Sequence, residues 1–296
     1  MRVRPPYRRR AATRALALLA AALVACAPAS SAPTSSAPAS PQGVVLVGTT
    51  TTTQDTGLLD VLVPDFERRT GWKVKLVVGG SGQILTQAAR GDLDVILTHS
   101  PPDEEAFVKT GDATDRRLVM HNDFVVLGPP ADPAGIRGAK ISDALRRIYD
   151  AGARFISRGD RSGTNVKELA LWHDAGRDPK GKPWYVESGV GQLQNLQLAV
   201  TRRAYTLSDR GTWIANQKQL ADLAVLVQGG ATLLNVYHVI VLDPARFARI
   251  EIRGARAFAD YLVGRDGQAL IAAYGVRQFG QATFTADAGR NEADLE

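Results

Sequence analysis

Cysteine is almost absent from this chain, which has one Cys in 296 residues, at Cys26. A single cysteine makes no internal disulfide and no cysteine-ligated metal site. Histidine is also scarce, and none of the spacings between its four copies is typical of a metal site; they are His99, His121, His173 and His238. Ser81 and Ser162 lie in no serine-nucleophile motif. We therefore expect no catalytic residues, no cofactor and no resident metal.

Acidic residues are missing from the first 25 positions, which carry six arginines. The apolar run that follows, Ala15–Ala25, is too short to cross a bilayer as a mature helix, and the pattern is typical of a signal peptide over 1–25. Removal of this segment lowers the formal net charge from +6 to zero. The basic character therefore belongs to the signal, and nothing in the mature chain predicts binding to nucleic acid.

The signal ends in Leu23-Val24-Ala25-Cys26, which resembles the bacterial lipoprotein signal, with cleavage before the cysteine and lipid on its sulfur. A chance cysteine at the end of an ordinary signal peptide is the alternative. The Arg8–Arg10 cluster leaves Sec and twin-arginine export both open. Residues 26–42 are Cys26 followed by an Ala, Pro, Ser and Thr tether that cannot build a core. We expect an exported, lipid-anchored protein that faces the periplasm or the cell exterior.

From residue 43 onward, short apolar segments alternate with amphipathic helical ones, which predicts an α/β fold with mixed, mainly parallel sheets and helices on both faces. Segments 118–119 and 124–127 are predicted as strands around a turn. The proline-rich stretch 129–133 predicts a crossing between two lobes, and 229–234 a return. The prediction is lobe one at 43–128 plus 238–286, lobe two at 131–232, and a frayed tail at 287–296.

Five consecutive threonines, Thr49–Thr53, stand where a predicted strand turns into a helix. Hydroxyl groups beside the free N–H groups of a helix start suit the binding of an anion, although one capping Thr with four neighbours is the simpler interpretation. A second loop, Ser157–Thr164, has the same order of strand, polar turn and helix. It adds Arg158, whose guanidinium suits an oxyanion, and Asp160, which we expect to pair with that arginine.

A third loop, Gly79–Gly82, also leads from a strand into a helix. It lacks the Gly-Lys-Ser/Thr ending of a phosphate-binding P-loop and the glycine spacing of a dinucleotide-binding loop. A turn that serves chain geometry alone is the alternative. Only one of the three loops contains an arginine, so a cleft between them would hold an anion mostly by neutral dipoles.

As an ordered set, these motifs resemble the tungstate-binding proteins of bacterial ABC importers (TupA-like), which have the type II periplasmic binding protein fold. The resemblance covers about residues 43–280 and rests on Thr49–Leu59, Gly91–Val95, Asn122–Val125, Asp132–Ile136, Ser157–Thr164, Leu171-Trp172, Trp184-Tyr185 and Leu207–Thr212. It implies two lobes, each a mixed, mainly parallel sheet flanked by helices, with the ligand in the cleft between them.

The resemblance also implies the site and its ligand, one tetrahedral oxyanion, either tungstate or molybdate. Carried over onto this sequence, the family's contacts are Thr51, Thr52, Ser81, Arg158, Ser162, Gly163 and Thr164. Thr52 stands where the family usually has Ser, and Ser81 where Thr is expected. These departures keep the hydroxyl groups but put selectivity in doubt.

The implied function is capture of the oxyanion by a monomeric solute-binding lipoprotein, which delivers it to a permease driven by an ATPase subunit. Phosphate is the nearest alternative, because the loop 158–164 also resembles that of phosphate-binding proteins. Hydrogen phosphate carries a proton and gains from an acceptor carboxylate, whereas tungstate carries none. We therefore expect Asp160 to serve Arg158, and Asp55 to serve a helix start, rather than the ligand. An enzyme and a purely structural surface lipoprotein are the alternatives of other classes.

Overall fold

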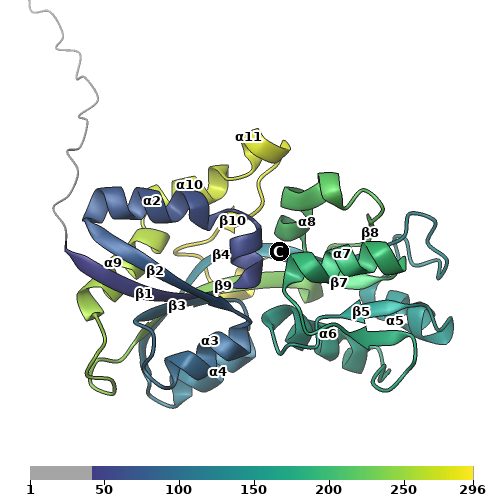
Figure 1. Cartoon of the computed structure of the whole chain (residues 1–296), viewed down its shortest axis with the longest axis horizontal. Coiled ribbons are helices and arrows are strands. Elements are labelled where there is room, and N and C mark those ends of the chain that lie inside the picture. The colour runs from purple at the N-terminus through teal and green to yellow at the C-terminus, as the bar shows by residue number, and fades with distance from the viewer. Residues whose placement is uncertain (1–41, 296) are drawn as a thin grey trace, which may run out of the picture. The chain divides into compact units, whose positions relative to one another are not determined.

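The computed structural model of the chain describes residues 42–295, and Figure 1 colours this part from purple to yellow. The predicted signal peptide 1–25, Cys26 and the tether up to residue 41 lie outside the described residues. In the described part, no helix combines the length and the apolar character that a membrane span needs. The lipid anchor therefore remains a prediction.

The central feature is an eight-stranded sheet whose main path runs β10-β4-β9-β3-β1-β2, with β7 and β8 also paired to β4. Its strands are β1 (Gly43–Thr50), β2 (Trp72–Gly79), β3 (Val95–Thr98), β4 (Ala113–Gly128), β7 (Thr206–Asp209), β8 (Ala224–Val227), β9 (Leu234–Leu242) and β10 (Thr285–Ala286). A second sheet pairs β5 (Phe155–Ser157) with β6 (Tyr185–Glu187).

Helices cover both faces of the sheet in the first lobe. Figure 1 shows α2 (Leu59–Thr70) and α10 (Arg265–Ala273) on one side of β1–β3, and α3 (Ser81–Ala88) and α4 (Pro101–Lys109) on the other. The strands supply alternate residues to the two faces: Val95 packs with α2 and α9 (Ile252–Val263), and Ile96 with α3 and α4. Burial on both sides explains why β3 is almost continuously apolar, whereas β2 at the sheet edge carries exposed lysines.

The second lobe surrounds β5–β8 and the end of β4 with four helices, which are α5 (Ile141–Asp150), α6 (Gly163–Asp174), α7 (Gln192–Arg202) and α8 (Arg210–Asn216). Its core has two clusters, one around Trp172 and Phe155 and the other around Ile156 and Leu196. The remaining short elements are α1 (Thr51–Asp55), α11 (Val276–Phe279), and the 3₁₀ turns Gln217–Gln219, Ala231–Leu233 and Glu292–Asp294.

Two long strands connect the lobes. β4 pairs with β9 as far as Asp123, then continues without interruption and pairs with β7 and β8 from Phe124. The predicted turn between 119 and 124 is therefore wrong, because both halves of this segment have ladder partners. The second hydrophobic cluster begins at Phe124, and the first includes Met120 and Tyr237, so the cores divide close to where the sequence predicts the lobes to divide.

The two-lobed α/β architecture is as predicted, but the expectation of mainly parallel pairing is wrong for the large sheet. β1 pairs in parallel with β2 and β3, whereas β9, β4, β10, β7 and β8 all join in antiparallel pairs. The reason is that β4 leaves the first lobe and β9 returns to it. Because β4 and β9 lie side by side and run in opposite directions between the lobes, they pair as antiparallel strands.

The C-terminal segment, predicted to fray, packs against the first lobe as far as Leu295. Asp287 is buried and lies 2.6 Å from His121 through its Oδ2. Glu292 lies 3.1 Å from His238 Nε2, and the side chain of Leu295 is buried. The composition of this segment is polar, but its carboxylates have buried partners that the sequence pattern does not reveal.

Candidate anion site

Three strand-to-helix turns carry the predicted anion contacts, and each is built as a helix start. Thr50 caps α1 by accepting a hydrogen bond from the N–H of Thr53 at 3.4 Å. Ser162 caps α6 by accepting from Asn165 N at 3.3 Å. Gly80 precedes α3 in extended conformation, and its N–H donates to Gln83 Oε1. The first N–H groups of a helix lack acceptors within the helix, so all three turns present donors.

The turns from the two lobes touch each other. Gly82 N, at the start of α3, donates to the carbonyl oxygen of Arg161 at 3.3 Å. A Cβ added to Gly80 would lie 3.3 Å from Ser162 Cβ, and one added to Gly163 would lie 2.7 Å from the carbonyl oxygen of His99. The structure thus brings the predicted loops of both lobes together in a closed arrangement, which leaves no room for a side chain at Gly163 and little at Gly80.

Two buried hydroxyl groups at these helix starts are unsatisfied. Among the described residues, neither Ser81 Oγ nor Thr164 Oγ1 has a hydrogen-bond partner. Ser81 is 0% and Thr164 1% exposed, and they come from α3 and α6, in opposite lobes. Leaving a buried hydroxyl without a partner costs about 1–3 kcal/mol, so two at meeting helix starts indicate a polar ligand.

Arg158 is the cation of the site and is 2% exposed. Its guanidinium donates to Thr51 Oγ1 in the other lobe at 3.1 Å, to the carbonyl oxygen of Val190 at 3.3 Å, and to Gln192 Oε1 at 3.4 Å. It also makes an ion pair with Asp160. A guanidinium fixed on all sides is preorganised, so it binds an anion without further loss of side-chain freedom.

The two acidic candidates are both engaged elsewhere. The predicted pairing of Asp160 with Arg158 is confirmed, and Asp160 Oδ1 also accepts from Ser162 N at 3.0 Å. Asp55 Oδ2 accepts from Leu193 N at 3.1 Å, at the start of α7 in the other lobe. It thus serves a helix start as expected, although not that of its own helix. Burial raises the pKa of Asp55, against the lowering effects of this hydrogen bond and of Arg158.

Within the threonine run, Thr51 and Thr52 differ in how their hydroxyls are used. Thr51 Oγ1 accepts from Arg158, which leaves its own proton free to donate. Thr52 Oγ1 is fully buried and lies 2.8 Å from Thr50 Oγ1 and 2.9 Å from His99 Nε2. The hydroxyl of Thr52 is therefore occupied inside the protein, and only its backbone N–H remains as the donor of a helix start.

Comparison with known proteins now adds to this geometry. Residues 28–266 match the family described as PBP superfamily domain. The tungstate-binding protein TupA of Peptoclostridium acidaminophilum is 40% identical over 252 residues, which cover 84% of this chain and 87% of that protein. The chain belongs to this family of periplasmic binding proteins. The family resemblance seen in the sequence is thereby confirmed.

Solved structures support the same family. The crystal structure of the tungstate ABC transporter from Geobacter sulfurreducens is similar with a TM-score of 0.72 and 44% identity, covering 78% of this chain and 98% of that one. The tungstate-binding protein TupA from Desulfovibrio alaskensis G20 gives a TM-score of 0.71 and 37% identity, covering 83% of this chain and all of that one.

The sequence analysis did not place a fourth helix start, that of α7, in the site. α7 begins at Gln192, which is fully buried and accepts from Arg158, and its neighbour Leu193 donates to Asp55. The signal was present, since Ser188-Gly189-Val190-Gly191 is another polar, glycine-containing turn between a strand and a helix. It also missed His99 and Asn235, which meet behind the threonine run through contacts distant in sequence.

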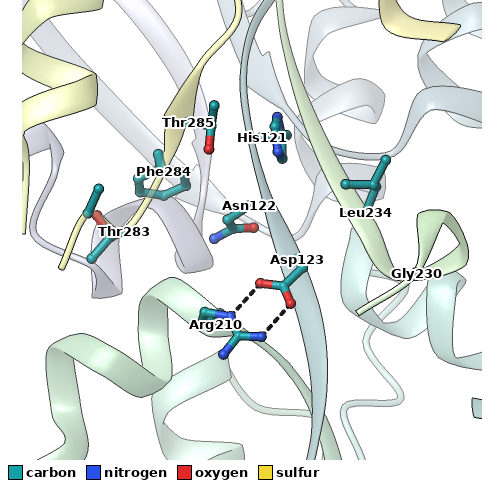
Figure 2. Close-up of a pocket in the computed structure, with 10 residues that line it drawn as sticks. His121, Asn122, Asp123, Arg210, Gly230, Leu234, Thr283, Phe284 and Thr285 are labelled. Atoms are coloured by element: carbon teal, nitrogen blue, oxygen red, sulfur yellow. Dashed lines mark hydrogen bonds and ion pairs between the residues drawn. The ribbon is translucent and has the colours of Figure 1, made fainter. Parts of the chain in front are cut away.

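An open cavity beside the crossing strands is a different feature. Its volume is about 290 Å³. Figure 2 shows the residues that line it, among which Asp123 of β4 and Arg210 of α8 form a bidentate ion pair. His121, Asn122 and Thr283–Thr285 also line it, but none of the predicted anion contacts does. In the described residues, no group of three or more His, Cys, Asp or Glu side chains could hold a metal ion.

Behind the loop 158–162, α6 carries a buried carboxyl group, Glu168, which is 3% exposed. It accepts hydrogen bonds from Ser157 Oγ at 2.6 Å, Tyr185 OH at 2.7 Å and Trp172 Nε1 at 3.1 Å. Burial outweighs these bonds and raises its pKa to about 7. The folded protein thus holds this proton more tightly than the unfolded chain does.

A pH-dependent stability follows from Glu168. Its stabilising proton is fully bound below the ordinary pKa of 4.5 and is lost as pH rises through about 7. Relative to Glu168→Gln, the wild type should therefore lose about 3 kcal/mol of unfolding free energy between pH 4.5 and pH 8. Urea unfolding of both proteins at several pH values measures this difference. A difference that does not change with pH would contradict the assignment.

Proposed function

We propose that this protein is the extracytoplasmic solute-binding lipoprotein of an ABC importer and that it captures one tetrahedral oxyanion, tungstate or molybdate, between its lobes. The observation that carries this proposal is the pair of unsatisfied hydroxyls, Ser81 Oγ and Thr164 Oγ1, at helix starts that meet from opposite lobes. Arg158 and Thr51 complete a set of donors from both lobes. The names of the similar proteins, which bind tungstate, support the choice of ion.

Charge also favours a fully deprotonated anion. Arg158 and Asp160 neutralise each other, so the anion meets hydroxyls and helix N–H groups, which are donors that need no proton from the ligand. The carboxylates of Asp160 and Asp55 are already occupied by Arg158 and Leu193. Hydrogen phosphate would find no carboxylate free to accept its proton, which supports tungstate over phosphate.

Lobe closure supplies the mechanism of capture. Only the closed state brings donors from both lobes to the same anion, so binding shifts the population from open to closed. The closed form then docks on the permease, and a separate ATPase subunit drives transport. The chain itself needs no catalytic residue and no cofactor for this task. We propose a monomer that is exported and anchored by lipid at Cys26.

The lobes that close are proposed as residues 43–128 plus 238–286 and residues 131–232. The ladder partners of β4 support a point of bending within that strand, since its pairing changes from β9 to β7 and β8 between Asp123 and Phe124. β9 begins at Leu234 and leads the chain back into the first lobe.

Removal of an unsatisfied hydroxyl should weaken binding without lowering the stability of the ligand-free protein. Ser81→Ala and Thr164→Val each remove a donor to the anion, so each should weaken tungstate binding about tenfold. Neither should lower the melting temperature of the ligand-free protein, because no internal hydrogen bond is lost. Calorimetry and thermal melts test both statements. Ser162→Ala is the matched control, since this hydroxyl caps α6 and its loss should destabilise the ligand-free protein.

Isothermal titration calorimetry on the wild type tests the function itself. Tungstate and molybdate should bind with a stoichiometry of one, and a tenfold excess of phosphate or sulfate should displace neither. Tighter binding of phosphate than of tungstate would assign the protein to phosphate instead. Absence of binding by all four ions would refute an oxyanion site.

A further inference from the structure

A continuous series of buried side-chain hydrogen bonds leads from the threonine run to the second lobe. Thr52 Oγ1 lies 2.9 Å from His99 Nε2, and His99 Nδ1 lies 2.7 Å from Asn235 Oδ1. Asn235 Nδ2 donates to Asn122 Oδ1 at 2.7 Å, and Asn122 Nδ2 donates to Asp209 Oδ1 at 3.4 Å. The series passes through both crossing strands, because Asn122 belongs to β4 and Asn235 to β9.

The direction of every proton in this series follows from its end at Asp209. Burial raises the pKa of Asp209 to about 6, so the carboxylate is ionised at neutral pH and only accepts. It accepts from Thr212 N at 2.8 Å and from the amide of Asn122. The oxygen of Asn122 must then face the amide nitrogen of Asn235. That nitrogen also donates to Tyr237 OH at 3.0 Å, so both of its protons are used.

The remaining oxygen of Asn235 can only accept, and its partner is Nδ1 of His99, which must therefore carry a proton. His99 is 3% exposed and stacks on Tyr237 with ring centroids 4.7 Å apart. Burial lowers its pKa to about 4, so the imidazole is neutral and Nε2 has no proton. Nε2 accepts, and the hydroxyl of Thr52 donates to it.

The same proton direction continues among the other hydroxyls of the threonine run. Thr52 Oγ1 has given its proton to His99, so at 2.8 Å from Thr50 Oγ1 it accepts. Thr50 Oγ1 in turn lies 2.8 Å from Thr53 Oγ1, whose proton it accepts. Three hydroxyls of the run, those of Thr50, Thr52 and Thr53, therefore direct their protons along one series. The hydroxyl of Thr51 lies beside Arg158 and outside this series, and that of Thr49 has no partner among the described residues.

We propose that His99 and Asn235 are positioning residues of the anion site, which fix the proton direction of the threonine run and thereby hold the first turn of α1 toward the ligand. In this arrangement the hydroxyl of Thr52 belongs to the wall of the site, while Thr51 and the backbone N–H groups of α1 face the anion. The effect on affinity rests on the proposed function, but the proton direction does not.

Nitrogen-15 NMR of the ligand-free wild type tests the proton direction without any ligand. His99 should carry its proton on Nδ1, with an unprotonated Nε2, from pH 7 to pH 8, and the signal is assigned by its loss in His99→Phe. A protonated Nε2, alone or in an imidazolium, would overturn the proposal. This result stands whether or not the protein binds tungstate.

A double-mutant cycle tests the positioning role. His99→Phe keeps a ring on Tyr237 but removes the acceptor, and Thr52→Val keeps the shape but removes the donor. Each should weaken tungstate binding about tenfold, and the double variant should bind within about twofold of the weaker single variant, because both remove one interaction. If the affinity loss of the double variant instead equals the product of the two single losses, His99 does not act through Thr52.

His173→Phe controls for loss of a histidine, since the side chain of His173 is 90% exposed. Its affinity for tungstate should equal that of the wild type. If the wild type does not bind tungstate, the proposed function is refuted. The NMR result would still decide the proton direction.

Discussion

Arg158→Ala should weaken tungstate binding by about 30-fold or more and is the largest expected effect of a single change. Truncation of one partner of a buried, hydrogen-bonded charge pair costs about 2–5 kcal/mol. Here the substitution removes the cation of the site and also leaves the mostly buried carboxylate of Asp160 without its ion-pair partner. The hydrogen bond that Arg158 donates to Thr51 in the other lobe is lost as well. Calorimetric titration with tungstate measures the change in affinity.

Arg161→Ala is the matched control, because it removes an arginine from the same loop. The side chain of Arg161 is exposed, and its backbone rather than its guanidinium holds Asn165 and Gly82. We expect its affinity to stay within about threefold of the wild type. Equal losses in the two variants would mean that general positive charge, rather than the buried Arg158, attracts the anion.

Gly163→Ala should weaken tungstate binding at least tenfold, although it adds one methyl group. The new Cβ would lie 2.7 Å from the carbonyl oxygen of His99 and 3.0 Å from its ring, both in the opposite lobe. Since backbone cannot move aside cheaply, the start of α6 would be held away from the first lobe. The ligand-free protein should melt as the wild type does, because an open state avoids the clash. Small-angle scattering with saturating tungstate should show incomplete closure.

Gly191→Ala provides the control for this substitution. Gly191 also precedes a helix at the lobe interface, but its added Cβ would meet Gln194 Oε1 at 3.4 Å and Thr51 Cγ2 at 3.8 Å, which are ordinary contacts. Wild-type affinity is therefore expected. Full closure and unchanged affinity in Gly163→Ala would show that the lobes do not need to approach as closely as in this structure.

Local sequence patterns were sufficient for the elements that form the site. The alternation of apolar and amphipathic segments predicted the α/β lobes, and the hydroxyl- and glycine-rich turns predicted a helix after each of the three loops. The charge of Arg158 and the nearness of Asp160 predicted their ion pair. In each case the residues that interact are close in sequence, so the local sequence pattern is enough to predict their contact.

Features that depend on distant contacts could not be predicted in this way. β4 is continuous because β9 and β7 pair with its two halves, and those partners lie about 80 to 130 residues away along the chain. The sequence did not indicate that Thr52 Oγ1 lies 2.9 Å from His99 Nε2, because the two residues are 47 positions apart along the chain. The tail near Asp287 likewise looked mobile, because its partner His121 lies on a strand far from it in sequence.

The most direct measurement of the central claim is a crystal structure of the tungstate complex, with tungsten located by its anomalous scattering. We expect one tungsten atom between the starts of α3 and α6, with Ser81 Oγ, Thr164 Oγ1 and Arg158 within hydrogen-bond reach of its oxygens. A peak in the cavity of Figure 2 would contradict the account. So would a carboxylate oxygen of Asp55 or Asp160 in hydrogen-bond contact with the anion.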